Sequence, residues 1–216
     1  TLPDATGALL TSADVPIQIT ATNNIGLGSG AVDSITTGDH NVGLGVDSLT
    51  AVTSGGHNVG VGRNTLKATT TATYNTAVGD AVLDVNTTGS NNVGVGADAL
   101  GQNTEGAENT AIGALALDAN TTASNNTAVG KSALSANTTG EVNSAFGALA
   151  MYTNTTGYGN TAVGKNSLYT NNGNNNTAVG HEALESNTTG ASNVGIGRDA
   201  LSANTTGAAN VAVGME

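Results

Sequence analysis

The chain has 216 residues, of which 38% are hydrophobic, 10% are charged and only 2% are aromatic, so aliphatic and small side chains must fill its core. A formal net charge of −11 excludes nucleic acids and anionic membrane surfaces as expected partners, because both repel an acidic protein. The absence of cysteine excludes disulfides and thiolate metal sites, and no apolar run reaches the roughly 18 residues that a membrane-spanning helix needs.

Residues 1–23 precede the regular part of the sequence and form a predicted lead-in segment. Within it the stretch "VPIQIT", residues 15–20, places Val15, Ile17 and Ile19 on one face of an expected short strand, with Pro16 near its beginning. The first fifteen residues lack the basic region of a secretion signal, and the chain opens at Thr1 without a methionine. These features lead us to expect a processed chain or part of a longer one.

From residue 24 to residue 216 the sequence is a tandem repeat with the consensus N-[TV]-[AG]-[VIL]-G-x-x-[AS]-L-x-x-N-T-T-G-x-x, whose positions are numbered 1 to 17 below. Ten of the eleven intervals between the opening asparagines are 17 residues long and one is 16. Asparagine at position 1 and glycine at position 5 are present in every copy. The opening asparagines are Asn24, Asn41, Asn58, Asn75, Asn92, Asn109, Asn126, Asn143, Asn160, Asn176, Asn193 and Asn210.

This repeat predicts an all-β fold, a parallel β-solenoid with about eleven to twelve coils of 17 residues. A helical repeat would avoid a glycine and an N-T-T-G in every unit. Instead, "NTAVG" and "SALSAN" read as two short strands per coil, with "TTG" returning the chain. We expect the apolar residues at positions 4 and 9 to form the core. The position-1 asparagines are expected to stack into a hydrogen-bonded ladder along the axis.

One copy, residues 160–175, is a residue shorter than the others, and its position tests the division into strands and turns. Alignment with neighbouring copies puts the missing residue at "NNG", residues 171–173, next to the predicted return turn. A turn can lose a residue without moving the strand to the opposite face, whereas a strand cannot. The deletion is therefore where a solenoid tolerates it.

The pattern of "NTAVG", "AL" and "NTTG" resembles the β-roll repeats in the heads of trimeric autotransporter adhesins, and it is also similar to repeats of bacteriophage tail fibres. The resemblance covers residues 24–216. It implies a left-handed β-roll and a parallel homotrimer. The columns of glycine or alanine at position 3 and of alanine or serine at position 8 agree with it, since small residues would let neighbouring backbones approach closely.

No catalytic residue, metal site or cofactor is predicted. The histidines are His40, His57 and His181, and the first two share position 17 with Tyr74. That column is either a surface ladder or an ion or ligand site, but two histidines without a third ligand at a suitable spacing give a weak metal signal. Carboxylates recur at positions 7 and 10 in broken columns, which indicates solvation more than calcium binding.

Tyrosines provide the candidate binding site. Tyr152 and Tyr169 share position 10 of adjacent copies, so their rings are expected to lie one above the other on the outside, with Tyr158 in the intervening return loop. Exposed stacked rings commonly bind sugar faces, and chance surface tyrosines are the alternative. These three residues are the candidate glycan-binding residues.

We therefore predict a non-enzymatic structural and adhesive fibre module of a virion or bacterial surface. It would act as a rigid extracellular stalk or head for attachment, trimerise with itself, continue into further fibre segments at either end and contact surface glycans, without nucleic acid or membrane insertion. The alternative is a stand-alone ice-binding or glycan-binding β-solenoid. The threonine pairs of "NTTG", such as Thr138 and Thr139, motivate the ice-binding version, although adjacent residues in a turn diverge.

Overall fold

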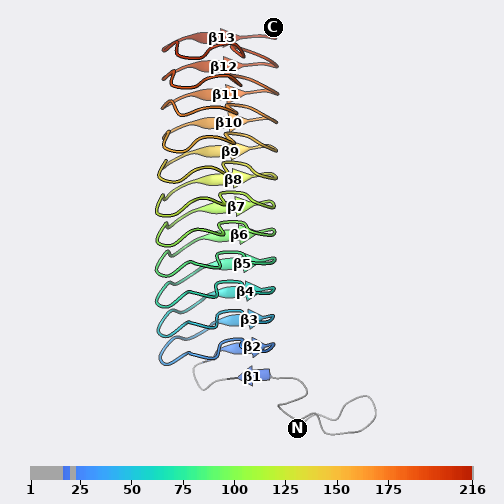
Figure 1. The fold of residues 1–216 in the computed structure, drawn as a ribbon, viewed down its shortest axis with the longest axis vertical. Coiled ribbons are helices and arrows are strands. Elements are labelled where there is room, and N and C mark those ends of the chain that lie inside the picture. The colour runs from blue at the N-terminus through green and yellow to red at the C-terminus, as the bar shows by residue number, and fades with distance from the viewer. Residues whose placement is uncertain (1–16, 20–22, 216) are drawn as a thin grey trace, which may run out of the picture.

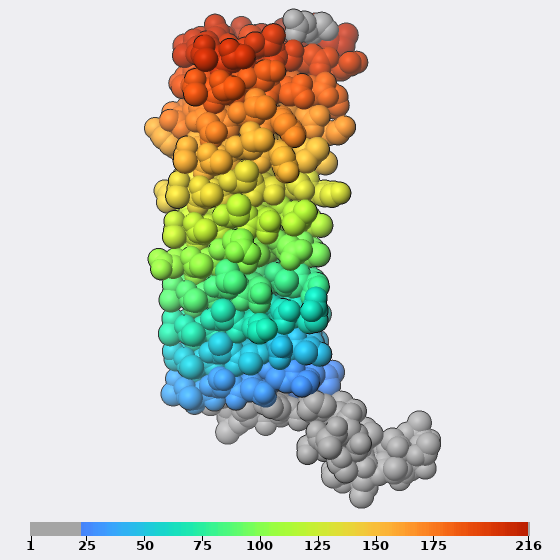
Figure 2. Space-filling model, in the orientation of Figure 1, coloured from blue at the N-terminus to red at the C-terminus, as the bar shows by residue number. Residues whose placement is uncertain are grey.

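The computed structural model describes residues 17–19 and 23–215, and their coils stack into one straight rod (Figures 1 and 2). One sheet of thirteen strands runs along the rod in chain order. The strands are β1 (Ile17–Ile19), β2 (Ile25–Leu27), β3 (Val42–Leu44), β4 (Val59–Val61), β5 (Thr76–Val78), β6 (Val93–Val95), β7 (Thr110–Ile112), β8 (Thr127–Val129), β9 (Ser144–Phe146), β10 (Thr161–Val163), β11 (Thr177–Val179), β12 (Val194–Ile196) and β13 (Val211–Val213).

Strands β2 to β13 are parallel, and each pairs with the same three repeat positions of the next coil. Thr110 of β7, for example, lies opposite Thr127 of β8. The parallel β-solenoid with 17 residues per coil is thus confirmed. Strand β1 pairs antiparallel with β2, which confirms a lead-in strand at Ile17–Ile19. The other residues of that predicted strand, Val15, Pro16 and Thr20, lie outside the described residues.

The prediction of a second strand at "SALSAN" is wrong, since each coil has one strand and turns fill the rest. Positions 7 and 9 adopt left-handed backbone conformations, as at Leu115 (φ 60°) and Leu117 (φ 52°), and a strand cannot pass through them. The turns are still bonded from coil to coil: the amide of Leu117 donates to the carbonyl of Ala133 at 3.1 Å. No helix able to cross a bilayer occurs in residues 17–19 and 23–215.

Glycine at position 5 is required by conformation and by space. Gly113 has φ 136°, a region that L side chains rarely adopt. A Cβ atom there would lie 2.5 Å from the carbonyl oxygen of Gly130 in the next coil. The column of position-5 glycines therefore allows the chain to turn sharply after each strand while the coils keep their close spacing.

The core differs from the expected one at position 4. In strands β2 to β13 the middle residue, Gly or Ala at position 3, points inward, whereas positions 2 and 4 point outward. Only a small residue fits inside: a Cβ on Gly26 would overlap with Cγ2 of Val32. The prediction that position 4 is core is therefore wrong. Leucine at position 9 was predicted correctly. These side chains, such as Leu117 and Leu134, are fully buried against the small residues at positions 3 and 8, except that Leu201 in the eleventh coil is partly buried.

The short coil, residues 160–175, keeps its strand in register. Thr161 of β10 lies opposite Thr177 of β11, although the two are 16 residues apart. The turn compensates with a side chain. Oδ1 of Asn172 accepts from the amide of Thr155 at 2.8 Å and from the amide of Thr156 at 3.2 Å. In other coils a backbone carbonyl accepts these two hydrogen bonds, as the carbonyl of Thr121 does from the amides of Thr104 and Glu105. The prediction that the deletion lies in the turn is confirmed.

Candidate functional site

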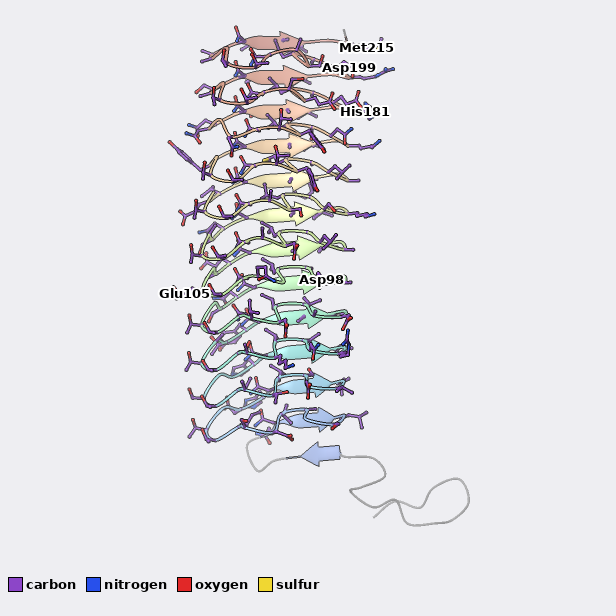
Figure 3. The ribbon with its side chains drawn as sticks, in the orientation of Figure 1. Asp98, Glu105, His181, Asp199 and Met215 are labelled. Carbon is purple, nitrogen blue, oxygen red and sulfur yellow. The ribbon has the colours of Figure 1, made fainter. Side chains whose placement is uncertain are left out.

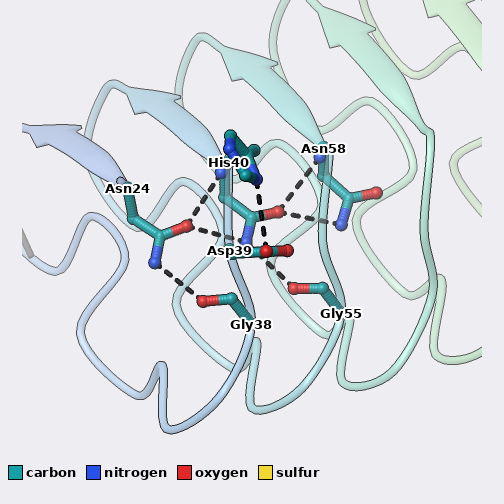
Figure 4. Close-up of polar contacts among 7 residues, drawn as sticks. Asn24, Gly38, Asp39, His40, Gly55 and Asn58 are labelled. Atoms are coloured by element: carbon teal, nitrogen blue, oxygen red, sulfur yellow. Dashed lines mark hydrogen bonds and ion pairs between the residues drawn. The ribbon is translucent and has the colours of Figure 1, made fainter. Parts of the chain in front are cut away.

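The asparagines at position 1 form the predicted ladder (Figure 4). Oδ1 of Asn24 accepts from the backbone amide of Asn41 at 2.8 Å and from its Nδ2 at 3.0 Å. Nδ2 of Asn41 also donates to the carbonyl of Gly55 at 2.9 Å, which closes its own coil. These asparagines are fully buried from Asn24 to Asn193. Each amide therefore links two coils and closes one, which satisfies polar groups that would be costly to bury alone.

A second asparagine ladder, at position 12, was not predicted from the sequence, which placed this asparagine at the end of the expected strand "SALSAN" and gave it no role. Nδ2 of Asn120 donates to Oδ1 of Asn103 at 2.7 Å and to the carbonyl of Ala123 at 3.0 Å. The same pattern continues along the rod from residue 86 to residue 204. The signal was present, because position 12 is asparagine in every copy from the fourth to the eleventh. This ladder also serves stability, since its amides are inside the rod.

The outward residues of the strands form a surface without any charge, here called the outer strand face. It consists of position 2 and position 4 of every coil and runs for about 50 Å at the usual strand spacing of about 4.8 Å. Position 4 is always apolar, and Ile112 and Phe146 are each 41% exposed. Position 2 is Val, Ile, Thr or Ser. The position-2 residues are Ile25, Val42, Val59, Thr76, Val93, Thr110, Thr127, Ser144, Thr161, Thr177, Val194 and Val211, and those at position 4 are Leu27, Leu44, Val61, Val78, Val95, Ile112, Val129, Phe146, Val163, Val179, Ile196 and Val213.

Charged side chains lie elsewhere on the coils. Figure 3 places Glu105 at one lateral edge of the rod and His181 and Asp199 at the other. At position 10, burial raises the pKa of Asp84 and of Asp118. Lys67 opposes the rise at Asp84, whereas the nearby charge of Asp98 adds to the rise at Asp118. None of these charged residues belongs to the outer strand face, which consists of positions 2 and 4 alone.

The predicted stack of tyrosines is present. The rings of Tyr152 and Tyr169 lie 5.4 Å apart with an interplanar angle of 24°, and both side chains are half-buried. Tyr158 is 51% exposed, and no ring contact joins it to the pair within the described part of the chain. The structure therefore brings two of the three candidate glycan-binding residues together. Glycan binding itself stays a prediction.

The column at position 17 is also a stack. The rings of His40 and His57 lie 4.9 Å apart and those of His57 and Tyr74 lie 4.8 Å apart, each pair within 5° of parallel. Asp39, which sequence reasoning did not connect with these rings, places Oδ2 3.2 Å from Nδ1 of His40. His57 is far from Asp39 and His40 in the sequence. The three residues can be recognised as neighbours only when the 17-residue coil length is used to place His57, in the next coil, beside His40.

The threonines at position 13 are part of the scaffold. Oγ1 of Thr138 donates to the carbonyl of Thr155 in the next coil at 3.1 Å, and Oγ1 of Thr87 does the same to Thr104 at 3.0 Å. A hydroxyl held in this way offers little to a ligand. The threonine pairs that motivated an ice-binding surface in the turn therefore lose half of their free hydroxyls to inter-coil bonds.

Comparison with known proteins adds no relative: no protein-family model and no curated protein sequence matches this chain. The resemblance to adhesin heads and tail fibres therefore stays an expectation, as do the homotrimer, the extracellular location and the absence of enzymatic activity. What the geometry provides is a stiff rod with two buried asparagine ladders, one long uncharged face and two small stacks of rings.

Proposed function

We propose that this chain is a structural and adhesive fibre module of a virion or bacterial surface, in which copies associate side by side as a parallel homotrimer. The observation that supports this most is the outer strand face. Monomeric proteins rarely expose long continuous apolar surfaces, and such surfaces usually mark interaction sites. Here the face repeats an apolar residue at position 4 in every coil and includes no charge along the whole rod.

The contact proposed between copies differs from the one expected from the sequence. The small residues at positions 3 and 8, which we expected to lie between chains, are buried inside each coil, as Ala111 and Ala116 are. Positions 2 and 4 take their place in the proposal. Because every coil presents the same residues at the same spacing, parallel copies would meet with like residues at the same level, and each added coil would enlarge the contact.

Sedimentation equilibrium of the full chain tests this proposal, together with two lysine variants in one coil. We expect the unmodified chain to sediment with the mass of three chains. Ile112→Lys introduces a charge into the outer strand face and should yield monomers, because an unpaired charge is costly at an apolar contact. Thr122→Lys, on an exposed turn of the same coil, should leave the trimer intact. A monomeric unmodified chain, or equal effects of both variants, would contradict the proposal.

The adhesive part of the proposal concerns Tyr152 and Tyr169. Their stacked rings offer a broad apolar surface with hydroxyl groups, which suits the faces and hydroxyls of a sugar. A glycan array probed with the full chain should give binding that is lost in Tyr152→Ala and Tyr169→Ala. Tyr74→Ala, which removes a ring from the other stack, is the control and should retain binding. Equal binding by all variants would exclude this pair as the sugar site.

Ice binding is the second candidate, and the same outer strand face now favours it over the turn threonines. Threonine, serine, valine and isoleucine stand at even spacing on one sheet face, with hydroxyl and methyl groups directed outward. A thermal-hysteresis measurement distinguishes the candidates: freezing-point depression by a monomeric chain, abolished by Ile112→Lys, would replace the fibre proposal with this one.

A further inference from the structure

We propose that Asp39, His40 and His57 form a binding site for a divalent transition-metal ion that ties the first two coils of the rod together. One ligand atom from each side chain lies within 4.8 Å of the other two. Asp39 and His40 end coil 1, residues 24–40, and His57 ends coil 2, residues 41–57. Asp39 is thus the third ligand that spacing along the sequence does not suggest.

The backbone holds these three residues in place. The amide of His57 donates to the carbonyl of Asp39 at 2.9 Å, and both histidines sit in the left-handed conformation shared by their column. Gly56 makes room for the carboxylate, since a Cβ atom on residue 56 would lie 2.8 Å from Oδ1 of Asp39. The carboxylate can therefore lie across the gap between the coils, near both imidazoles (Figure 4 shows Asp39 and His40).

The side chains need only a small rearrangement to bind an ion. A tetrahedral ion with ligand bonds of about 2.0 Å requires ligand atoms about 3.3 Å apart. Oδ2 of Asp39 and Nδ1 of His40 are already 3.2 Å apart. To bring the remaining ligand atom into reach, the stacked imidazole rings must tilt toward each other. All three side chains are exposed, so they can rotate about their side-chain bonds without a clash in the interior. Two imidazoles and one carboxylate favour Zn²⁺, Cu²⁺ or Ni²⁺ over Ca²⁺ and Mg²⁺.

A second cluster, His181 with Glu182 and Asp199, has the same spread of ligand atoms but is a poorer site. It contains one imidazole. Oδ2 of Asp199 already pairs with the guanidinium of Arg198 at 3.0 Å, and Oε1 of Glu182 accepts from Asn166 at 3.3 Å. An ion there would have to compete with the Arg198 guanidinium for Asp199, so this cluster supplies the control.

The ion would strengthen the rod at its first two coils. In a stacked repeat, stability depends on contacts between neighbouring coils, and an ion held by both coils adds to that contact only while they remain stacked. Binding should therefore slow the local opening that exposes the amide of His57 to exchange. This prediction separates a bridging ion from one that binds a single coil.

Calorimetric titration of Zn²⁺ into the full chain without an affinity tag tests the site. We expect saturable binding of one ion. His57→Asn and Asp39→Ser should each weaken it at least tenfold, since loss of even an outer partner of a metal ligand costs about 10–100-fold. Other coils carry these residues at the same positions, as at Asn91 and Ser90, so both variants should fold. His181→Asn should bind Zn²⁺ as the unmodified chain does.

Hydrogen exchange provides the second measurement. With Zn²⁺ the amide of His57 should exchange at least about tenfold more slowly, while the amide of Ser192, which donates to Asn174 in the same way, should not change. The proposal is overturned if Zn²⁺ does not saturate the chain or if only His181→Asn weakens binding. It is also overturned if the ion binds without protecting His57.

Discussion

The first three coils, residues 24–74, and the eight that follow, residues 75–209, share one fold but stabilise it differently. At position 12 the first three coils have Ile35, Val52 and Thr69, whereas every later coil has asparagine. At position 17 the first three coils stack His40, His57 and Tyr74, whereas later coils carry smaller or more polar residues without a ring. The backbone path is the same in both regions.

Both regions need the asparagine ladder at position 1. Position 12, in contrast, can hold either an apolar side chain or an asparagine. An apolar side chain such as Val52 fills the interior without a hydrogen bond, and an asparagine such as Asn120 fills it with three. The junction between the two types of coil leaves one buried polar atom without a hydrogen bond. Thr69 occupies position 12 of the third coil, directly before the first coil with asparagine there. It is buried, and its Oγ1 has no hydrogen-bond partner.

The largest effect is expected from converting a later coil to the earlier type. Asn120→Val should lower the free energy of unfolding by about 3 kcal/mol, because Oδ1 of Asn103, Nδ2 of Asn137 and the carbonyl of Ala123 each lose a buried partner. Urea unfolding measures this. Thr122→Val, on the exposed turn of the same coil, is the control and should change stability by less than about 0.5 kcal/mol. Equal effects would mean that the second ladder contributes nothing.

A smaller effect of opposite sign is expected at the junction. Thr69→Val should raise the free energy of unfolding by about 1 kcal/mol, since it removes a buried hydroxyl without a partner and keeps the shape of the side chain. The reverse change in the neighbouring coil, Val52→Thr, should be destabilising. If Thr69→Val instead lowers the unfolding midpoint, the hydroxyl has a partner and the junction carries no cost.

Position 17 provides a third comparison. Val142 has φ 57° and is 60% exposed, a conformation that a β-branched side chain adopts at a cost and that asparagine tolerates. Val142→Asn should therefore stabilise the chain by about 1 kcal/mol. His57→Asn should instead lower the unfolding midpoint slightly, because histidine is not β-branched and already tolerates this conformation, while the ring stack is lost. Differential scanning calorimetry of both variants checks this contrast, which fails if the two shift the midpoint equally.

The smallest effect concerns pH. Burial and the charge of Asp98 raise the pKa of Asp118 above its ordinary value of 3.8, so the folded chain holds this proton at pH values where the unfolded chain has released it. The free energy of unfolding should fall as pH rises from about 4 through the raised pKa. Asp118→Asn should flatten this slope, measured by urea unfolding at several pH values. Asp84→Asn should also flatten it, because burial raises the pKa of Asp84 as well. An unchanged slope in Asp118→Asn would refute this.

Sequence reasoning captured the features that depend on repetition. The coil length, the parallel register and the ladder at position 1 follow from a period that only a stack of equivalent units explains. The missing residue of the short coil was placed correctly in the turn, because a deletion within a strand would have shifted its side chains to the opposite face. These predictions needed no knowledge of where side chains point.

The errors share one physical cause. The pattern of "SALSAN" does not reveal that residues such as Ser132 and Leu134 take left-handed conformations, since non-glycine residues seldom do. The predicted second strand therefore failed. Without that turn geometry, the small residue at position 3 could not be identified as the inward one, and position 4 was assigned to the core. Asp39 was missed for a related reason, because it meets His57 only across the gap between coils.

The claim that copies associate through the outer strand face is tested most directly by chemical cross-linking, since the chain has no cysteine of its own. Ile112→Cys treated with a short bismaleimide should yield covalently joined chains, and Thr122→Cys should not. Cross-linking of Thr122→Cys alone, or of neither variant at concentrations where the chain is soluble, would contradict the account and leave the rod as a single chain whose apolar face serves another purpose.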